Sequence, residues 1–254
     1  MSVTVTQLAI APVKGLRLMP AEELEITATG VAGDRAFVLV DADHKLVETS
    51  RAPRLLQVAP GFADGRLTLR FPDGGEVSEV PEPGERVKTA FYDDRPVTGQ
   101  LVDGALSDAL SSHMGHRVSL VALDPAQQGA DDSPVTLMSA ASLAALGDHL
   151  GSGIPDGRRF RMTITIDGAD AWEEHGWAGR EVAIGQEVAL RVIDPVVRCV
   201  VTTRDPEQGK ADLPITKALA ELRGKHDVTF GVWCGVSRPG FVRVGDPVSP
   251  ASSP

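Results

Sequence analysis

The stretch RLTLRFPDGG at residues 66–75 decides the fold class of this chain. Apolar and polar side chains alternate from Arg66 to Phe71, which is typical of a half-buried β-strand. The Pro-Asp-Gly-Gly sequence that follows is a turn, so the stretch predicts a hairpin. Outward from it, the first half predicts a helix over about 103–114 and further strands at 3–10, 24–27, 36–40, 45–49 and 117–123.

The second half begins after a polar segment at 124–133. Ser139 is placed to cap a helix that ends at Gly151, and a second helix is expected from Pro214 to Gly224. Strands are predicted at 160–166, 188–193, 196–202, 227–236 and 241–244. The fold class is therefore α+β and strand-rich, with domains at 1–125 and 126–248 and a disordered tail at 249–254.

Composition restricts the function classes. The 254 residues carry 35 acidic against 25 basic side chains, a net charge of −10, which disfavours nucleic acid and anionic membranes as partners. Seven of the acids lie between 73 and 94 with only two bases. That segment is interpreted as a solvated surface or as a docking face for a basic electron donor, in which Glu82 and Glu85 would take part.

The cellular location is inferred from what the sequence lacks. No apolar run approaches the ~20 residues that span a bilayer, and no signal peptide is evident, so a cytoplasmic protein is expected. Its two cysteines, Cys199 and Cys234, are then expected to be reduced. The common nucleotide, zinc and hydrolase motifs are absent, so chemistry by the unaided protein is poorly supported.

Three clusters contain candidate functional residues. PVKG at 12–15, GVAGDR at 30–35 and TSR at 49–51 place Lys14, Arg35 and Arg51 at turns or strand ends. They would form an anion site if they converge, or scattered surface ion pairs if they do not. In RRFR at 158–161, strand alternation predicts Arg159 and Arg161 on one face.

The third cluster is DPVVRCVVTTRDP at 194–206, which contains Cys199. A cysteine in a valine-rich strand is commonly a small core residue. Arg198 and Arg204 would instead favour a reactive thiolate if they reach it. The residues alone leave both readings open.

Taken together, these motifs resemble the MOSC family, including its usual N-terminal β-barrel domain. The resemblance rests on PVKG, GDR at 33–35 and TSRAPRL at 49–55 in the first half. In the second half it rests on DSPVTLMSAASLAAL at 132–146, FRMTITID at 160–167, VRCVVTTRDPEQG at 197–209 and FGVWCGVSRPGFVRVGDPV at 230–248. It implies a MOSC-type β-barrel domain preceded by a MOSC N-terminal β-barrel domain, similar to bacterial YcbX-type proteins and the mitochondrial amidoxime-reducing component.

The resemblance also implies a cofactor and its ligands. In that group a pyranopterin carries molybdenum, and the cysteine of the Arg-Cys motif, here Cys199, is a thiolate ligand of the metal. Cys234 is expected in the core. The family's PVKS reads PVKG here, and its FRPN reads FRMT. The implied contacts to the molybdenum cofactor (Mo-molybdopterin) come from Lys14, Arg35, Arg51, Ser139, Arg161, Thr163 and Arg198.

The function implied is reduction of N-hydroxylated compounds, such as hydroxylamines and amidoximes, by a molybdenum enzyme. Asp205 is the candidate proton donor because it lies near Cys199 in sequence. With only two cysteines the chain cannot hold a four-cysteine cluster, so a separate electron-donor protein is implied. The alternatives are a sulfur carrier with a persulfide on Cys199, and a cofactor storage or insertion protein.

Overall fold

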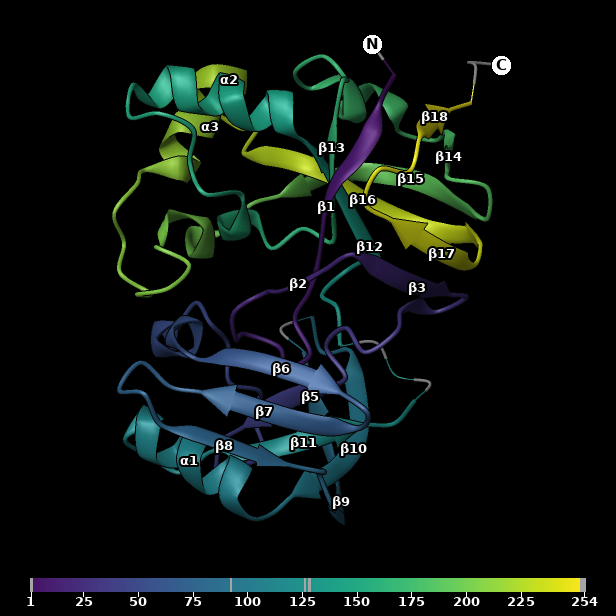
Figure 1. Ribbon diagram of the computed structural model, residues 1–254. Coiled ribbons are helices and arrows are strands. Elements are labelled where there is room, and N and C mark those ends of the chain that lie inside the picture. The colour runs from purple at the N-terminus through teal and green to yellow at the C-terminus, as the bar shows by residue number, and fades with distance from the viewer. Residues whose placement is uncertain (1, 92, 126, 128, 252–254) are drawn as a thin grey trace.

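The computed structural model describes residues 2–91, 93–125, 127 and 129–251 and consists of two stacked units (Figure 1). The upper unit is built on an eight-stranded sheet of order β18-β14-β15-β16-β12-β13-β1-β2, with a smaller sheet β17-β3-β4 beside it. Its strands are β1 (Thr4–Ile10), β2 (Met19–Ala21), β3 (Glu23–Thr27), β4 (Gly30–Val31), β12 (Val135–Ser139), β13 (Ile164–Asp167), β14 (Glu181–Ile184), β15 (Val188–Val197), β16 (Thr229–Arg238), β17 (Gly240–Arg243) and β18 (Val248–Pro250). Its helices are α2 (Ala140–Leu150), α3 (Ile215–Arg223) and the 3₁₀ turns η2 (Gly157–Phe160), η3 (Glu173–Trp177) and η4 (Val200–Thr203).

The lower unit contains two further sheets, of order β5-β11-β10-β9 and β6-β7-β8. The hairpin predicted from residues 66–75 is β7 with β8, which pair in antiparallel fashion. The elements are β5 (Phe37–Val40), η1 (Pro53–Gln57), β6 (Ala59–Ala63), β7 (Arg66–Arg70), β8 (Glu76–Glu79), β9 (Pro83–Ala90), β10 (Pro96–Val102), α1 (Ala105–Met114) and β11 (Ser119–Leu123). The strand-rich α+β class is thus confirmed.

The first strand of the chain lies in the upper unit, with strands from the second half. β1 pairs with β13 in antiparallel register, Leu8 opposite Ile164, and β3 pairs with β17. In Figure 1 the purple β1 runs through the upper unit before the chain descends to the lower one. The first strands of the sequence are therefore part of the upper unit, so the two units do not coincide with the predicted domains at 1–125 and 126–248.

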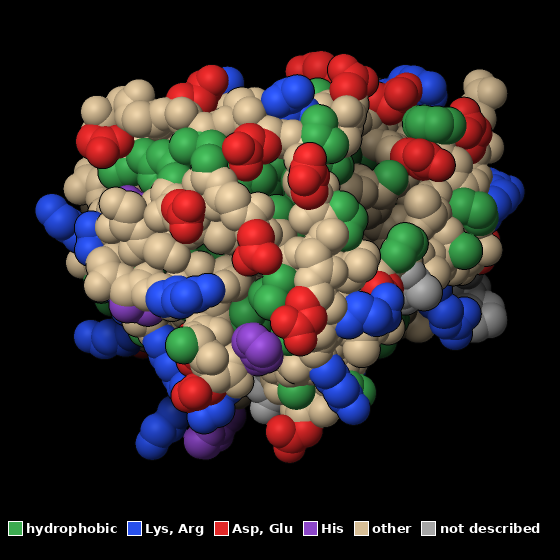
Figure 2. Space-filling view, turned by 90° about the horizontal axis from the view of Figure 1, so that it is seen from below, with side chains coloured by type: hydrophobic (Ala, Val, Ile, Leu, Met, Phe, Trp, Pro, Cys, Tyr) green, Lys and Arg blue, Asp and Glu red, His purple; other side chains and the backbone are tan. Residues whose placement is uncertain are grey.

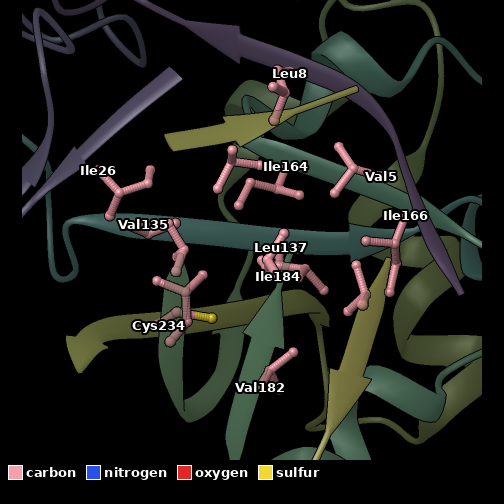
Figure 3. Packing of buried hydrophobic residues seen from close by; sticks show 14 of the residues in the cluster. Val5, Leu8, Ile26, Val135, Leu137, Ile164, Ile166, Val182, Ile184 and Cys234 are labelled. Carbon is pink, nitrogen blue, oxygen red and sulfur yellow. The ribbon is translucent and has the colours of Figure 1, made fainter. Parts of the chain in front are cut away.

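The core of the upper unit is formed by apolar residues that point inward from these strands (Figure 3). Cys234 on β16 is fully buried among them, opposite Val135 on β12. Burial without a partner charge disfavours the thiolate and raises the pKa of Cys234 to about 12. The expectation that Cys234 is a core residue is confirmed.

The helix predictions follow cap chemistry and are confirmed. Ser139 precedes α2, and its hydroxyl accepts the Ala141 N–H at 3.2 Å, while Gly151 ends the helix in the left-handed region. Among the described residues no helix is long and apolar enough to cross a membrane.

Four predictions of local structure are wrong. Residues 45–49 form no strand, only a bridge from Leu46 to Val40. The strand expected at 160–166 begins at Ile164, because 157–160 turn as η2. The strand expected at 196–202 ends at Val197, because the chain turns into η4. Residues 248–250, partly assigned to a disordered tail, pair with β14; 252–254 lie outside the described residues.

Acidic and basic side chains alternate over the lower unit. Figure 2 shows its face from below, where red carboxylates are separated by blue, green and tan atoms and form no continuous patch. Some of the carboxylates are paired: Glu76 lies 2.7 Å from Arg70. The concentration of acids in the 73–94 sequence therefore does not produce a uniformly acidic surface on this face.

Candidate functional site

A cavity of about 380 Å³ is lined by residues of both units. Six of the candidate cofactor-binding residues line it, and no single stretch of sequence contributes them all. From the first part of the chain come Lys14 and Arg35, and from the upper unit come Arg161, Thr163, Arg198 and Cys199. Of the three residues expected to form an anion site, Lys14 and Arg35 meet at this cavity, each in an ion pair with a carboxylate, and Arg51 lies outside it.

Cys199 lies at the mouth of this cavity. The strand prediction would have buried it, but its side chain is exposed and precedes η4. The change of direction comes from backbone hydrogen bonding: the Arg198 N–H donates to the Val228 carbonyl, and the Thr202 N–H donates back to the Cys199 carbonyl at 3.2 Å. The thiol is therefore placed by a turn of the main chain and is accessible to a ligand.

Arg198 is held by the cavity wall. Its guanidinium donates to the Phe160 carbonyl and lies 5.5 Å from the centre of the Phe160 ring. Burial, together with repulsion from Arg35, lowers the pKa of Arg198 to about 10, against the attraction of Cys199 and Asp131. Its Nε is buried with no hydrogen-bond partner, so part of this cation's bonding capacity is unused.

Arg161 is a half-buried cation in the cavity wall. It follows η2 in the left-handed conformation, at φ 54°, so Arg159 and Arg161 do not alternate as in a strand. Burial and the charge of Arg35 lower the pKa of Arg161 to about 10. Within the described part of the chain, no hydrogen bond or ion pair of its guanidinium is found, whereas Arg159 is bound bidentately to Asp212 at 2.7 Å.

Arg35 is positioned by its neighbours on the β4–β5 connection. Asp34 accepts the Ala11 N–H at 2.7 Å and forms an ion pair with the Arg35 guanidinium. The Arg35 N–H donates to the Ala11 carbonyl at 2.8 Å, and its other Nη donates to the Arg161 carbonyl at 3.5 Å. The GDR motif thus orients its arginine toward the upper unit.

Lys14 forms an ion pair with Asp131, a residue that the sequence analysis assigned to a polar boundary. The Lys14 Nζ lies 2.5 Å from Asp131 Oδ1, donates to the Gly129 carbonyl at 3.2 Å and stands 4.8 Å from the Phe91 ring centre. Burial lowers the pKa of Lys14 despite Asp131, and Arg35 adds to this. Burial also acts to raise the pKa of Asp131, but the Lys14 charge outweighs it and the net shift is downward.

The remaining sequence-predicted residues do not line the cavity. Arg51 is exposed outside it, although Thr49 and Ser50 of the same motif are in its wall. Ser139 is completely buried as the cap of α2. The carboxylate of Asp205 accepts the N–H groups of Glu207 at 2.9 Å and Gln208 at 2.7 Å in a tight turn.

An apolar wall completes the cavity, and sequence reasoning missed it. Phe160 stacks on buried Phe230, with ring centres 3.9 Å apart, and Trp233 and Met162 lie beside it. Thr163 is bonded to Thr136 rather than turned to solvent: its N–H donates to the Thr136 hydroxyl at 2.9 Å. Among the described residues, no group of three His, Cys, Asp or Glu side chains could hold a metal ion.

Two family models match the chain. Residues 124–249 match the MOSC domain, and residues 2–96 match the MOSC N-terminal β-barrel domain. Lys14 and Arg35 lie within the match to the N-terminal domain, and Cys199 lies within the match to the MOSC domain, so the cavity contains residues of both.

Curated relatives agree with these matches. Mitochondrial amidoxime-reducing component 1 is 29% identical in Homo sapiens, over 96% of this chain and 82% of that protein. The Xenopus laevis protein of the same name is 28% identical, over 96% of this chain and 81% of that protein. Molybdenum cofactor sulfurase of Caenorhabditis elegans is 26% identical, over 91% of this chain and 33% of that protein. The chain belongs to the MOSC-domain family, with the N-terminal domain that accompanies it.

Proposed function

We propose that this protein is a molybdenum-cofactor-dependent oxidoreductase that reduces N-hydroxylated compounds. One observation carries the proposal: the exposed Cys199 thiol and the Arg161 guanidinium, which has no partner in the part of the chain that the structure describes, line the same cavity, and both units form it. The similarity to amidoxime-reducing components supports the class of reaction.

The cavity residues fit an anionic cofactor with a soft metal. Arg161 is a cation with no partner among the described residues, and Arg198 has a buried Nε without a hydrogen bond. A phosphate bound in the cavity would supply acceptors to the Arg161 guanidinium, and its charge would offset the burial and the repulsion from Arg35 that lower the pKa values of both arginines. A thiolate such as that of Cys199 is a suitable ligand for a soft metal.

A bound molybdenum cofactor would supply the two-electron redox chemistry. The overall change converts an N–OH group, two electrons and two protons into an N–H group and water, so protons must reach the cavity. Asp205 is committed to its own turn, whereas Lys14 and Asp131 lie in the wall. We assign proton delivery to Lys14, whose pKa is lowered by burial, with Asp131 holding its ammonium in place.

The substrate and the electron donor come from outside the chain. The apolar wall of Phe160, Met162 and Trp233 suits the organic part of a small N-hydroxylated molecule. Electrons are supplied by a separate reductase or carrier protein, which must approach the cavity mouth where Cys199 is exposed.

Metal analysis tests the proposal. The protein is produced in a host that makes molybdenum cofactor, as wild type, Cys199→Ala and the matched control Cys234→Ala. We expect stoichiometric molybdenum and extractable pterin in the wild type and the control, and loss of molybdenum in Cys199→Ala. Benzamidoxime turnover with an artificial electron donor should follow the metal. Wild-type protein without molybdenum would contradict the proposal.

A second function, sulfur transfer, is favoured by the exposure of Cys199 and by the similarity to molybdenum cofactor sulfurase. In this case a separate desulfurase loads a persulfide onto the thiol. Mass spectrometry of the metal-free protein would then show an increase of about 32 mass units, one sulfur atom, that reductant removes. If the protein binds molybdenum and reduces substrate while no such adduct is found, the carrier role is excluded.

A further inference from the structure

A short hairpin follows η4, five residues beyond Cys199. It is closed by a bridge between Arg204 and Ala211 and by the Asp205 N–H, which donates to the Lys210 carbonyl at 2.7 Å. At its tip the Asp205 carboxylate accepts two N–H groups, and the Gly209 N–H donates to the Asp205 carbonyl at 2.9 Å. The side chain of Asp205 therefore determines the shape of the tip.

The tip of this hairpin contacts the lower unit and the segment leading to it. In Figure 1 it hangs on the left from the upper unit toward η1. Arg17 donates to the Glu207 carbonyl at 3.0 Å, and Gln57 donates to the Gln208 carbonyl at 3.0 Å. Gly209 lies so close to η1 that a Cβ on it would be 2.3 Å from the Pro53 carbonyl oxygen.

The hairpin is connected to Cys199 without a flexible joint. The Thr202 N–H and hydroxyl both donate to the Cys199 carbonyl, at 3.2 Å and 3.0 Å. The Arg204 N–H donates to the Val201 carbonyl, and the Asp212 N–H donates to the Thr203 carbonyl. A displacement of the tip would therefore be transmitted to the backbone that carries the thiol.

Two cations also fix the segment that joins β11 to β12 and lines the cavity with Ala130 and Asp131. Lys14 donates to the Gly129 carbonyl and pairs with Asp131, and Arg95 donates to the Ala130 and Asp131 carbonyls at 2.6 Å and 2.7 Å. This part of the cavity wall is therefore fixed independently of the hairpin. Cys199 is exposed, so little side-chain packing locates its thiol and the backbone must do so.

We propose that the tip at 205–210, docked on the lower unit, positions the Cys199 thiol at the cavity. Asp205 and Gly209 are then positioning residues, and the lower unit contributes to the site by fixing the thiol as well as by supplying Lys14. The proposal deepens the proposed function and rests on it only for the metal readout below.

The test uses the full chain and the variant Gly209→Ala, whose methyl group collides with Pro53. Gly179→Ala is the matched control: Gly179 has φ 80°, close to the 71° of Gly209, but no atom lies within 4 Å of its added Cβ. Both variants strain the backbone equally, and only the first displaces the tip. The double variant Arg17→Met, Gln57→Met removes both hydrogen bonds to the tip, together with the Arg17 bond to the Leu56 carbonyl, without backbone strain.

The first readout is hydrogen–deuterium exchange of the peptide covering 199–204. We expect it to exchange about thirtyfold faster in Gly209→Ala and in the double variant, the factor for losing two hydrogen bonds of ordinary strength. Peptides of β13 should exchange as in the wild type, and Gly179→Ala should match the wild type at 199–204. Folded variants whose 199–204 exchange is unchanged would overturn the proposal.

The second readout is molybdenum per chain after expression in a cofactor-producing host, which should fall in Gly209→Ala and not in Gly179→Ala. Faster exchange with undiminished molybdenum would also overturn the positioning role, because the thiolate would then bind metal wherever the tip lies. A wild type without molybdenum contradicts the proposed function alone, and the exchange result still decides whether the tip fixes Cys199.

Discussion

Replacing Arg161 by Met should make the cofactor-free protein more stable. Lowering an arginine pKa from 12.5 to about 10 corresponds to about 3 kcal/mol of cost for the charged form, at ~1.4 kcal/mol per pKa unit. The side chain is only half-buried, and solvent in the cavity screens it, so we expect about 1–2 kcal/mol to be recovered. Methionine keeps an unbranched apolar stem, though it is two atoms shorter, and the change removes no side-chain hydrogen bond within the described residues.

Urea unfolding of cofactor-free protein measures this effect, with Arg159→Met as the matched control two residues away. Arg159 is bound bidentately to Asp212, so its loss should lower the free energy of unfolding by about 1–3 kcal/mol. Both variants remove one positive charge from the same wall, but only Arg161→Met should raise stability. A lower free energy of unfolding for Arg161→Met than for the wild type would refute the view that no interaction offsets the cost of burying the Arg161 charge.

Three other predictions concern the framework of the upper unit. Burial and the charge of Arg223 lower the pKa of His175 to about 4. As the pH falls, the unfolded chain binds a proton at this histidine near pH 6.5, before the folded protein does, so the free energy of unfolding should decrease between pH 6.5 and 4. Thermal unfolding across this pH range should show a decrease that is about 1–2 kcal/mol smaller in His175→Leu. Gly231→Ala should lower the free energy of unfolding in urea by about 2–4 kcal/mol. Gly231 has φ 65°, and an added Cβ would lie 2.8 Å from the Leu137 carbonyl oxygen, so an unchanged free energy of unfolding would contradict this account. Phe230→Leu removes the buried ring that stacks behind Phe160 of the cavity wall. It should cost about 1–2 kcal/mol of stability while molybdenum binding persists, as calorimetry and metal analysis together would show.

Features that depend on local chemistry could be predicted from the sequence. Ser139 caps α2 because a hydroxyl before a helix bonds the N–H groups of its own first turn. Cys234 lies in the core because apolar residues surround it in its own strand. Both interactions are decided within a few residues, so pattern alone identifies them.

The site itself depends on contacts that are distant in sequence. Asp131 looks like a polar linker residue until the fold brings Lys14 to within 2.5 Å of it. Cys199 follows a run of strand-forming residues, but the bond from Arg198 to Val228 and the turn of η4 end the strand before it. Asp205 is near Cys199 in sequence, yet its carboxylate is used by the hairpin tip. The spacing of residues along the sequence does not reveal any of these contacts.

The position of β1 in the upper sheet has a consequence for folding during synthesis. Residues 4–10 leave the ribosome well before their partner β13, which lies at 164–167. At about 5–20 residues per second, the first strand waits roughly 8–30 s for that partner. Closing so long a loop makes contact order high and folding slow. Until β13 is made, the edge of β1 that will pair with it is exposed and can pair with another chain. A chaperone that covers β1 during this interval would therefore most improve the yield of native protein.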